Sequence, residues 1–116
     1  MRTAQELFDT TVINLLKQDE ACMNEKLTCV YSNGYGLKCA VGWLIPDAEY
    51  DKSMEGLPVD ELITGGALTS ERTAEFRSNE DLLYSLQAVH DNFSVAKWPE
   101  RFRDVAKEFC LIYHAE

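Results

Sequence analysis

The sequence is poor in basic residues. Its 116 residues include 11 lysines and arginines against 20 aspartates and glutamates, which gives a formal net charge of −9. A chain this acidic repels the phosphate backbone of nucleic acids and also repels anionic membrane surfaces. Direct nucleic-acid binding is therefore not expected. Basic patches on other proteins and cations are the natural counterparts of such a surface, and the plain alternative is that the charge only keeps the protein soluble.

Long apolar runs are also missing. The longest uncharged stretches, 27–37 and 39–46, fall well short of the ~18 apolar residues that a membrane-spanning helix needs. No apolar region follows the single basic residue Arg2, so no secretory leader is expected. These absences predict a cytoplasmic protein whose thiols stay reduced.

Complete motifs for known chemistry are absent as well. The four cysteines stand at positions 22, 29, 39 and 110 and form no C-x-x-C pair, which argues against a zinc ribbon or a thioredoxin-like site. No G-x-S-x-G, P-loop or H-E-x-x-H pattern occurs either. Since no repeat, low-complexity tract or linker divides the chain, residues 1–116 are expected to form a single compact domain.

What the sequence does contain is helical patterning. Thr3 and Glu6 have the spacing of a capping box, and apolar residues then recur at helical spacing, which predicts a helix over 4–17. A short helix is predicted over 57–63, with Pro58 in its first turn and two glycines after its end.

Two further helices are predicted at the end of the chain. Ser78 can cap the first of them, whose apolar stripe runs from Leu82 to Phe93. The second begins at Trp98, with a proline at the next position, and its apolar face is predicted to extend to Cys110.

Strand signals lie between these helices. Residues 28–31 have strand composition, Asn33 and Gly34 suit a hairpin turn, and 37–39 can form the returning strand. The predicted fold is therefore α+β, a mainly helical small single domain with one β-hairpin. The apolar run 39–45 fits a buried strand or a buried helical turn equally well, and Gly42 within it indicates close packing. The predicted core comprises Phe8, Val12, Leu16, Val41, Leu44, Leu86, Val89, Phe102, Val105 and Phe109.

The negative charge is concentrated in the middle of the chain. Residues 45–75 hold eight acidic side chains against two basic ones, a net charge of −6. Carboxylates mixed with tyrosine and methionine suit a protein interface, because the charges steer a basic partner and the larger side chains anchor it. A solvated loop that serves only solubility is the alternative. The predicted protein-binding residues are Asp47, Glu49, Tyr50, Asp51, Met54 and Glu55.

A thiol site is a further possibility, because Cys39, His90 and Asp91 supply the residue types of a nucleophile, a base and an orienting carboxylate. Two arguments oppose it. Cys39 lies in an apolar run, which does not favour a thiolate. Asp91 follows His90 directly on a predicted helix, so the two side chains are expected to point about 100° apart. His90 is instead expected to be a buried histidine bonded to a carbonyl group.

Two kinds of metal site can be weighed. Asp47, Glu49 and Asp51 alternate as in a calcium loop, but Lys52 and Pro58 occupy the positions where an EF-hand needs glycine and glutamate. A zinc site built from Cys29, Cys39 and His90, with Cys22 as a possible fourth ligand, is conceivable, although no spacing demands it. Buried, apolar cysteines are the simpler interpretation, and no cofactor is predicted.

One segment carries a family resemblance. The run 39–50 reads Cys-Ala-Val-Gly-Trp-Leu-Ile-Pro-Asp-Ala-Glu-Tyr and continues to Met-Glu-Gly at 54–56. It resembles a family of small uncharacterised proteins from tailed bacteriophages and prophage-carrying bacteria, and the stretches 83–91 and 98–111 look like that family's closing helices. Trp43 stands where the family pattern leads us to expect cysteine. The resemblance implies a bacterial cytoplasm but no assigned activity or cofactor.

These observations predict a small, acidic, non-enzymatic phage or prophage accessory protein that binds a host or phage protein through the acidic segment 47–61. The alternative is a small metal-dependent or thiol-dependent enzyme with Cys39 and His90 at its site.

Overall fold

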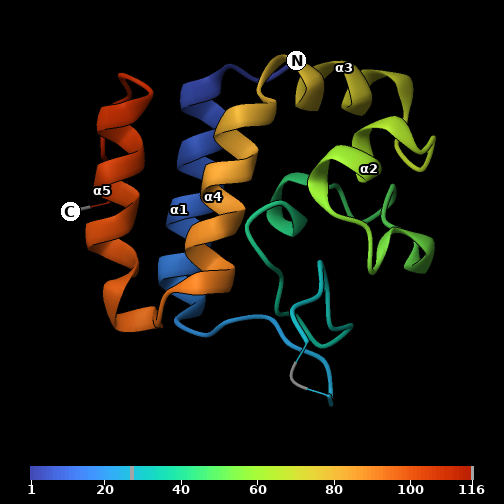
Figure 1. Ribbon diagram of the computed structural model, residues 1–116, viewed down its shortest axis with the longest axis horizontal. Coiled ribbons are helices and arrows are strands. Elements are labelled where there is room, and N and C mark those ends of the chain that lie inside the picture. Colours follow the sequence, from blue (N-terminus) through green and yellow to red (C-terminus); the bar gives the residue numbers. More distant parts are fainter. Residues whose placement is uncertain (27, 116) are drawn as a thin grey trace.

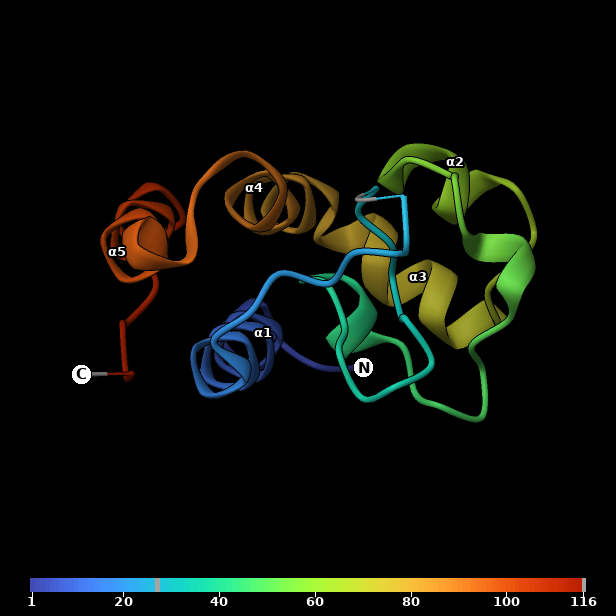
Figure 2. The ribbon, with the colours of Figure 1, turned by 90° about the horizontal axis from the view of Figure 1, so that it is seen from below.

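The computed structural model describes residues 1–26 and 28–115 and is built from helices. Helices α1, α4 and α5 stand side by side, while α2, α3 and the connecting segments form the other side of the molecule (Figure 1 and Figure 2). None of the described helices is long and apolar enough to cross a membrane. The α-helices are α1 (Ala4–Gln18), α2 (Val59–Thr64), α3 (Ser70–Ser78), α4 (Glu80–Asn92) and α5 (Trp98–Glu108), with short 3-10 helices η1 (Gly42–Leu44), η2 (Lys52–Met54) and η3 (Val95–Lys97) between them.

The predicted α+β class is wrong, because the described residues contain no β-sheet. Only two isolated bridges occur among them, Met23 with Cys29 and Ser32 with Lys38. The turn itself does form, since the side chain of Asn33 accepts hydrogen bonds from the backbone N–H groups two and four residues later.

The two arms pair with each other only beside the turn, where the N–H of Asn33 donates to the carbonyl of Leu37 and the N–H of Cys39 donates to the carbonyl of Tyr31. The carboxylate of Glu55 accepts hydrogen bonds from the N–H groups of Tyr31 and Ser32. On the other arm, the side-chain amide of Gln18 pairs with both the N–H and the carbonyl group of Lys38. The next ladder bond would join the N–H of Tyr31 to the carbonyl of Cys39, but Glu55 takes that N–H and the N–H of Trp43 takes that carbonyl. The pairing therefore stops at one bridge and does not build a sheet.

The first helix agrees with its prediction. Thr3 accepts from the N–H of Glu6, and the Glu6 carboxylate accepts from the N–H of Thr3, which completes the capping box. The helix ends at Gln18, one residue beyond the predicted boundary, because Asp19 adopts the left-handed conformation with φ of 56°.

Helix α3 was not predicted, and its presence corrects the start of α4. Ser78 is the last residue of α3 and does not cap the next helix; α4 begins at Glu80 after Asn79. Thr69 caps α3 by accepting a hydrogen bond from the N–H of Arg72. A polar helix of this kind escapes a search for apolar periodicity, because only one large apolar residue, Phe76, lies buried along it.

Glu75 of α3 is the centre of a buried ion-pair network. Its carboxylate accepts hydrogen bonds from the backbone and guanidinium of Arg2 at 2.8 to 3.1 Å, and from the guanidinium of Arg72 at 2.6 Å. Arg2 also donates to the carbonyl of Leu44, and Arg72 donates to Glu49. Burial would raise the pKa of Glu75, but these donors outweigh it and lower the pKa to about 2. The network joins the N-terminus to α3.

The apolar run 39–45 folds as a turn that leads into η1, and most of it is buried, as expected. Gly42 is required there, because a Cβ atom at this position would lie 2.0 Å from the carbonyl oxygen of Tyr31. All ten predicted core residues pack in or against the core, although Leu16 and Phe109 are only partly buried.

The two closing helices form, and each ends before the last apolar residue predicted for it. Trp98 begins α5 and proline occupies its first turn, as predicted. Phe93, however, lies outside α4 and is 38% exposed, and Cys110 lies beyond α5 and is exposed. Cys110 has a φ of 56°, a left-handed conformation that ends the helical periodicity before this residue.

Candidate functional site

A groove of about 440 Å³ runs between α4 and two loop segments. One wall is the loop 28–31, and the opposite wall is 55–59, the segment that leads into α2. The buried thiol of Cys39 also borders it. Helix α4 supplies the remaining side with Tyr84, Gln87, Ala88, Asp91 and Asn92.

Four of these α4 residues share one helical face. Tyr84, Gln87, Ala88 and Asp91 are spaced at i, i+3, i+4 and i+7. Sequence reasoning singled out only Asp91. The spacing of the other three was a readable signal, but a stripe of polar and small residues is equally typical of a helix face that meets only solvent.

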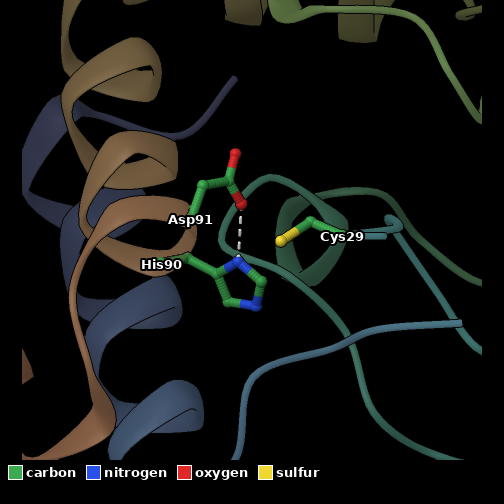
Figure 3. A group of neighbouring side chains, drawn as sticks. All are labelled: Cys29, His90 and Asp91. Atoms are coloured by element: carbon green, nitrogen blue, oxygen red, sulfur yellow. Dashed lines mark hydrogen bonds and ion pairs between the residues drawn. The ribbon is translucent and has the colours of Figure 1, made fainter. Parts of the chain in front are cut away.

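Asp91 is the convergence point of the site. Its Oδ1 atom lies 2.8 Å from Nδ1 of His90 (Figure 3) and 2.9 Å from Nε2 of Gln87. The thiol of Cys29 donates to the same carboxylate. Burial would raise the pKa of Asp91, but the hydrogen bonds from His90, Gln87 and Cys29 outweigh it and lower the pKa. The carboxylate is therefore ionised at neutral pH.

The contact between His90 and Asp91 corrects the expectation that neighbours on a helix point apart. The Nδ1 atom lies close to the backbone in a histidine ring, and Gln87 holds the Asp91 carboxylate back toward the preceding turn. The side of the ring and the carboxylate therefore meet, although the two Cα–Cβ directions diverge.

His90 is buried and uses both ring nitrogens. Its Nε2 atom accepts a hydrogen bond from the backbone N–H of Cys22 at 2.9 Å, rather than donating to a carbonyl group as expected. An accepting Nε2 places the proton on Nδ1, so the neutral imidazole donates to Asp91. The ring also stacks on Trp98, with centroids 5.6 Å apart.

Cys29, His90 and Asp91 hold potential metal-ligating atoms within 4.8 Å of one another. Sulfur, nitrogen and oxygen donors of these types suit zinc. A metal on Nδ1 would, however, displace the proton to Nε2, where it would face the N–H of Cys22. Burial and the adjacent Asp91 carboxylate raise the pKa of Cys29 to about 11, so its thiol is protonated. The three side chains are thus arranged as a hydrogen-bond network. Of the predicted zinc ligands, Cys29 and His90 belong to the cluster, and Asp91 occupies the place predicted for Cys39.

Cys39 borders this network through Gln87 but does not belong to the cluster of Cys29, His90 and Asp91. It is fully buried, its sulfur accepts a hydrogen bond from the N–H of Gly42, and burial raises the pKa of its thiol. In the described part of the chain it makes no hydrogen bond with His90. A protonated, enclosed thiol lacks the exposed and electropositive setting of a nucleophilic cysteine.

The residues predicted to bind a protein partner have varied surroundings. Asp47 pairs with Lys38, and Glu49 pairs with Arg72. Asp51 caps η2 by accepting from a backbone N–H. Met54 is fully buried in the core, so its side chain does not reach the surface.

Glu55 is the one residue of the predicted set that lines the groove. Its carboxylate accepts hydrogen bonds from the N–H groups of Tyr31 and Ser32 and from the hydroxyl of Tyr50. The hydroxyl of Tyr31 in turn donates to the carbonyl of Leu57. Glu55 therefore holds the two loop walls of the groove together.

No family model matches the chain, and neither a curated protein nor a solved structure matches it. The resemblance to phage and prophage proteins therefore stays a prediction.

Proposed function

We propose that this protein is a non-enzymatic binding protein that holds a segment of a protein partner in the groove between 28–31, 55–59 and α4. The observation that supports the proposal is the groove itself. Its volume of about 440 Å³ lies in the range of ligand sites, ~300–1,000 Å³, and helix α4 borders it on one side.

The walls of the groove have the composition of a binding surface. Val30, Tyr31, Leu57 and Val59 provide apolar area, and Gln87 and Asp91 provide polar groups at one side. Sites of this kind combine a largely apolar lining with a few well-placed polar groups that set orientation.

The proposal keeps the predicted role of the acidic segment 47–61, because 55–59 forms one wall of the groove. The rest of that segment carries further carboxylates, and a net negative charge steers a basic partner. The resemblance noted above suggests the source of the partner, a phage or host protein that meets a small phage or prophage accessory protein.

An enzymatic role has less support. Catalysis by a thiol needs a thiolate near a base. Here burial raises the pKa of both Cys29 and Cys39, and both ring nitrogens of His90 are engaged.

A peptide-library selection tests the proposed function. A random heptapeptide library is selected against the wild-type protein, and each enriched peptide is measured on Ala88→Phe, which fills the groove. The matched control is Ala74→Phe, the same change at an exposed alanine of α3 outside the groove.

Enriched peptides are expected to lose about tenfold or more in affinity on Ala88→Phe and to keep their affinity on Ala74→Phe. Thermal unfolding curves establish that both variants are folded. Peptides that bind Ala88→Phe as well as wild type would contradict the proposal.

A further inference from the structure

The charge of the groove is of one sign. Among the described residues that line it, Glu55 and Asp91 are the ionisable carboxylates, and no lysine, arginine or histidine is present. A concave, partly apolar site with uncompensated negative charge attracts a cation, because its walls exclude the water that would otherwise screen the field.

Asp91 carries its charge without a cationic partner in the described chain. Its three donors are the amide of Gln87, the neutral imidazole of His90 and the thiol of Cys29. An ionised carboxylate offers about four acceptor positions, so one more donor can be accommodated. The side chain is 36% exposed, so that donor can arrive from the groove.

The surroundings position this carboxylate before any ligand arrives. His90 is locked by the N–H of Cys22 and by Trp98, and Gln87 lies one turn earlier on the same helix. A carboxylate held in this way loses little conformational freedom when a donor binds, which favours recognition of a planar group with several N–H donors.

The rest of the groove suits apolar residues on either side of the cation. Tyr84 lies two turns before Asp91 on the same face of α4 and is 57% exposed. The rise between them is about 10 Å, roughly three residues of an extended peptide. Leu57 and Val59 line the facing wall.

We infer that the partner segment is a basic one and that an arginine side chain anchors it, with the guanidinium bound to Asp91 and apolar neighbours along the groove toward Tyr84. This inference rests on the proposed function, since it names the chemistry of the partner at that same groove. Arginine fits better than lysine, because its planar fork of donors matches a fixed carboxylate and its methylenes cover apolar walls.

The test uses two tripeptides that differ only in charge, acetyl-Leu-Arg-Leu-amide and its citrulline counterpart, titrated into ¹⁵N-labelled protein at low ionic strength. The arginine peptide is expected to shift the amide signals of Cys29, Ala88 and Asp91. The citrulline peptide replaces the guanidinium by a neutral urea group. Its affinity is expected to be at least about tenfold lower.

Variants assign the effect to Asp91. Asp91→Asn is expected to bind the arginine peptide with about tenfold lower affinity and the citrulline peptide with nearly unchanged affinity. Asp81→Asn, the same change at an exposed position of α4 outside the groove, is expected to bind as wild type does.

A second pair of variants keeps the test independent of the hydrogen bonds around Asp91. Asn92→Lys places an ammonium group beside the groove and is expected to lower the affinity for the arginine peptide about threefold or more. Asn92→Gln adds no charge and is expected to leave this affinity unchanged. Equal binding of both tripeptides, or no shifted groove amides with either, overturns the inference. The library selection with Ala88→Phe decides the proposed function separately, because it places no requirement on charge.

Discussion

The Nδ1 atom of His90 lies 2.8 Å from the Oδ1 atom of Asp91, although the two residues are neighbours on the last turn of α4. The direction of the proton decides what this contact does. Because Nε2 accepts from the N–H of Cys22, Nδ1 donates, and the imidazole orients the carboxylate. The aspartate is the exposed member that faces the groove, and the histidine is its buried support.

Two substitutions of His90 separate its two hydrogen bonds. Glutamine can place an oxygen near the position of Nε2 and keep the bond from Cys22, whereas asparagine is too short to reach it. His90→Asn is therefore expected to lower the free energy of unfolding by about 1–3 kcal/mol more than His90→Gln, because it leaves a buried N–H without an acceptor.

Urea unfolding of both variants measures this difference. The stacking on Trp98 is lost in both and cancels, and helix propensity favours glutamine by only a few tenths of a kcal/mol. Equal stabilities would contradict the assigned roles of the two nitrogens.

The buried carboxylate of Glu75 makes stability depend on pH. Its pKa falls from 4.5 to about 2 on folding, so the unfolded state takes up a proton first as the pH falls. The stabilisation is complete above pH 4.5 and is lost as the pH approaches 2, by about 3 kcal/mol in total. Urea unfolding at a series of pH values measures the slope.

Glu75→Gln should remove this contribution. It leaves Arg72 without a charged partner in α3, so we expect a loss of about 3 kcal/mol at pH 7, less than half of that difference near pH 3, and little difference as the pH approaches 2. Glu71→Gln, at an exposed position of the same helix, serves as the control and should follow the wild-type curve. A constant offset of the Glu75→Gln curve at all pH values would refute the assignment.

Two glycines should respond differently to alanine. At Gly42 the new Cβ would lie 2.0 Å from the carbonyl oxygen of Tyr31, and backbone must move to make room. We expect a loss of about 3 kcal/mol in unfolding free energy. Gly34 has a φ of 79° and open space around it, so alanine there should cost only about 1 kcal/mol of backbone strain. Thermal unfolding of the two variants compares them, and a reversed order would show that Gly42 is not closely packed.

The four cysteines should differ in reactivity. Cys110 is exposed and should be alkylated first by iodoacetamide at pH 7.5. Cys29 should follow slowly, because burial and Asp91 raise its pKa to about 11. Cys22 and Cys39 are buried and should react only when the protein unfolds.

Mass spectrometry of peptides from timed samples gives the order. The same samples in urea provide the control, in which all four thiols should react. Alkylation of Cys29 or Cys39 in the folded protein as fast as Cys110 would favour the thiol-dependent enzyme over the binding protein.

The polar residues of this protein show where sequence reasoning stops. Glu55 limits the pairing of the two arms around Asn33, because its carboxylate takes the N–H of Tyr31, 24 residues away, that the next ladder bond would need. The hairpin signals around Asn33 are genuine locally, since the turn forms. Local turn chemistry does not specify which partner the adjacent backbone will find.

Signals that act within one helical turn were sufficient for α1 and α5, and they located α2, which begins at Val59, two residues later than predicted, with Pro58 just before it. The capping box at Thr3, the proline before α2 and the proline in α5 each work over three or four residues, so their effect can be read from the sequence alone. The core residues predicted on α1, α4 and α5 followed from the same periodicity. The groove did not, because its walls come from 28–31, 55–59 and α4, and only the packing of the folded chain brings them together. The roles of His90 and Asp91 were decided in the same way, by a backbone N–H at Cys22, 68 residues from the histidine.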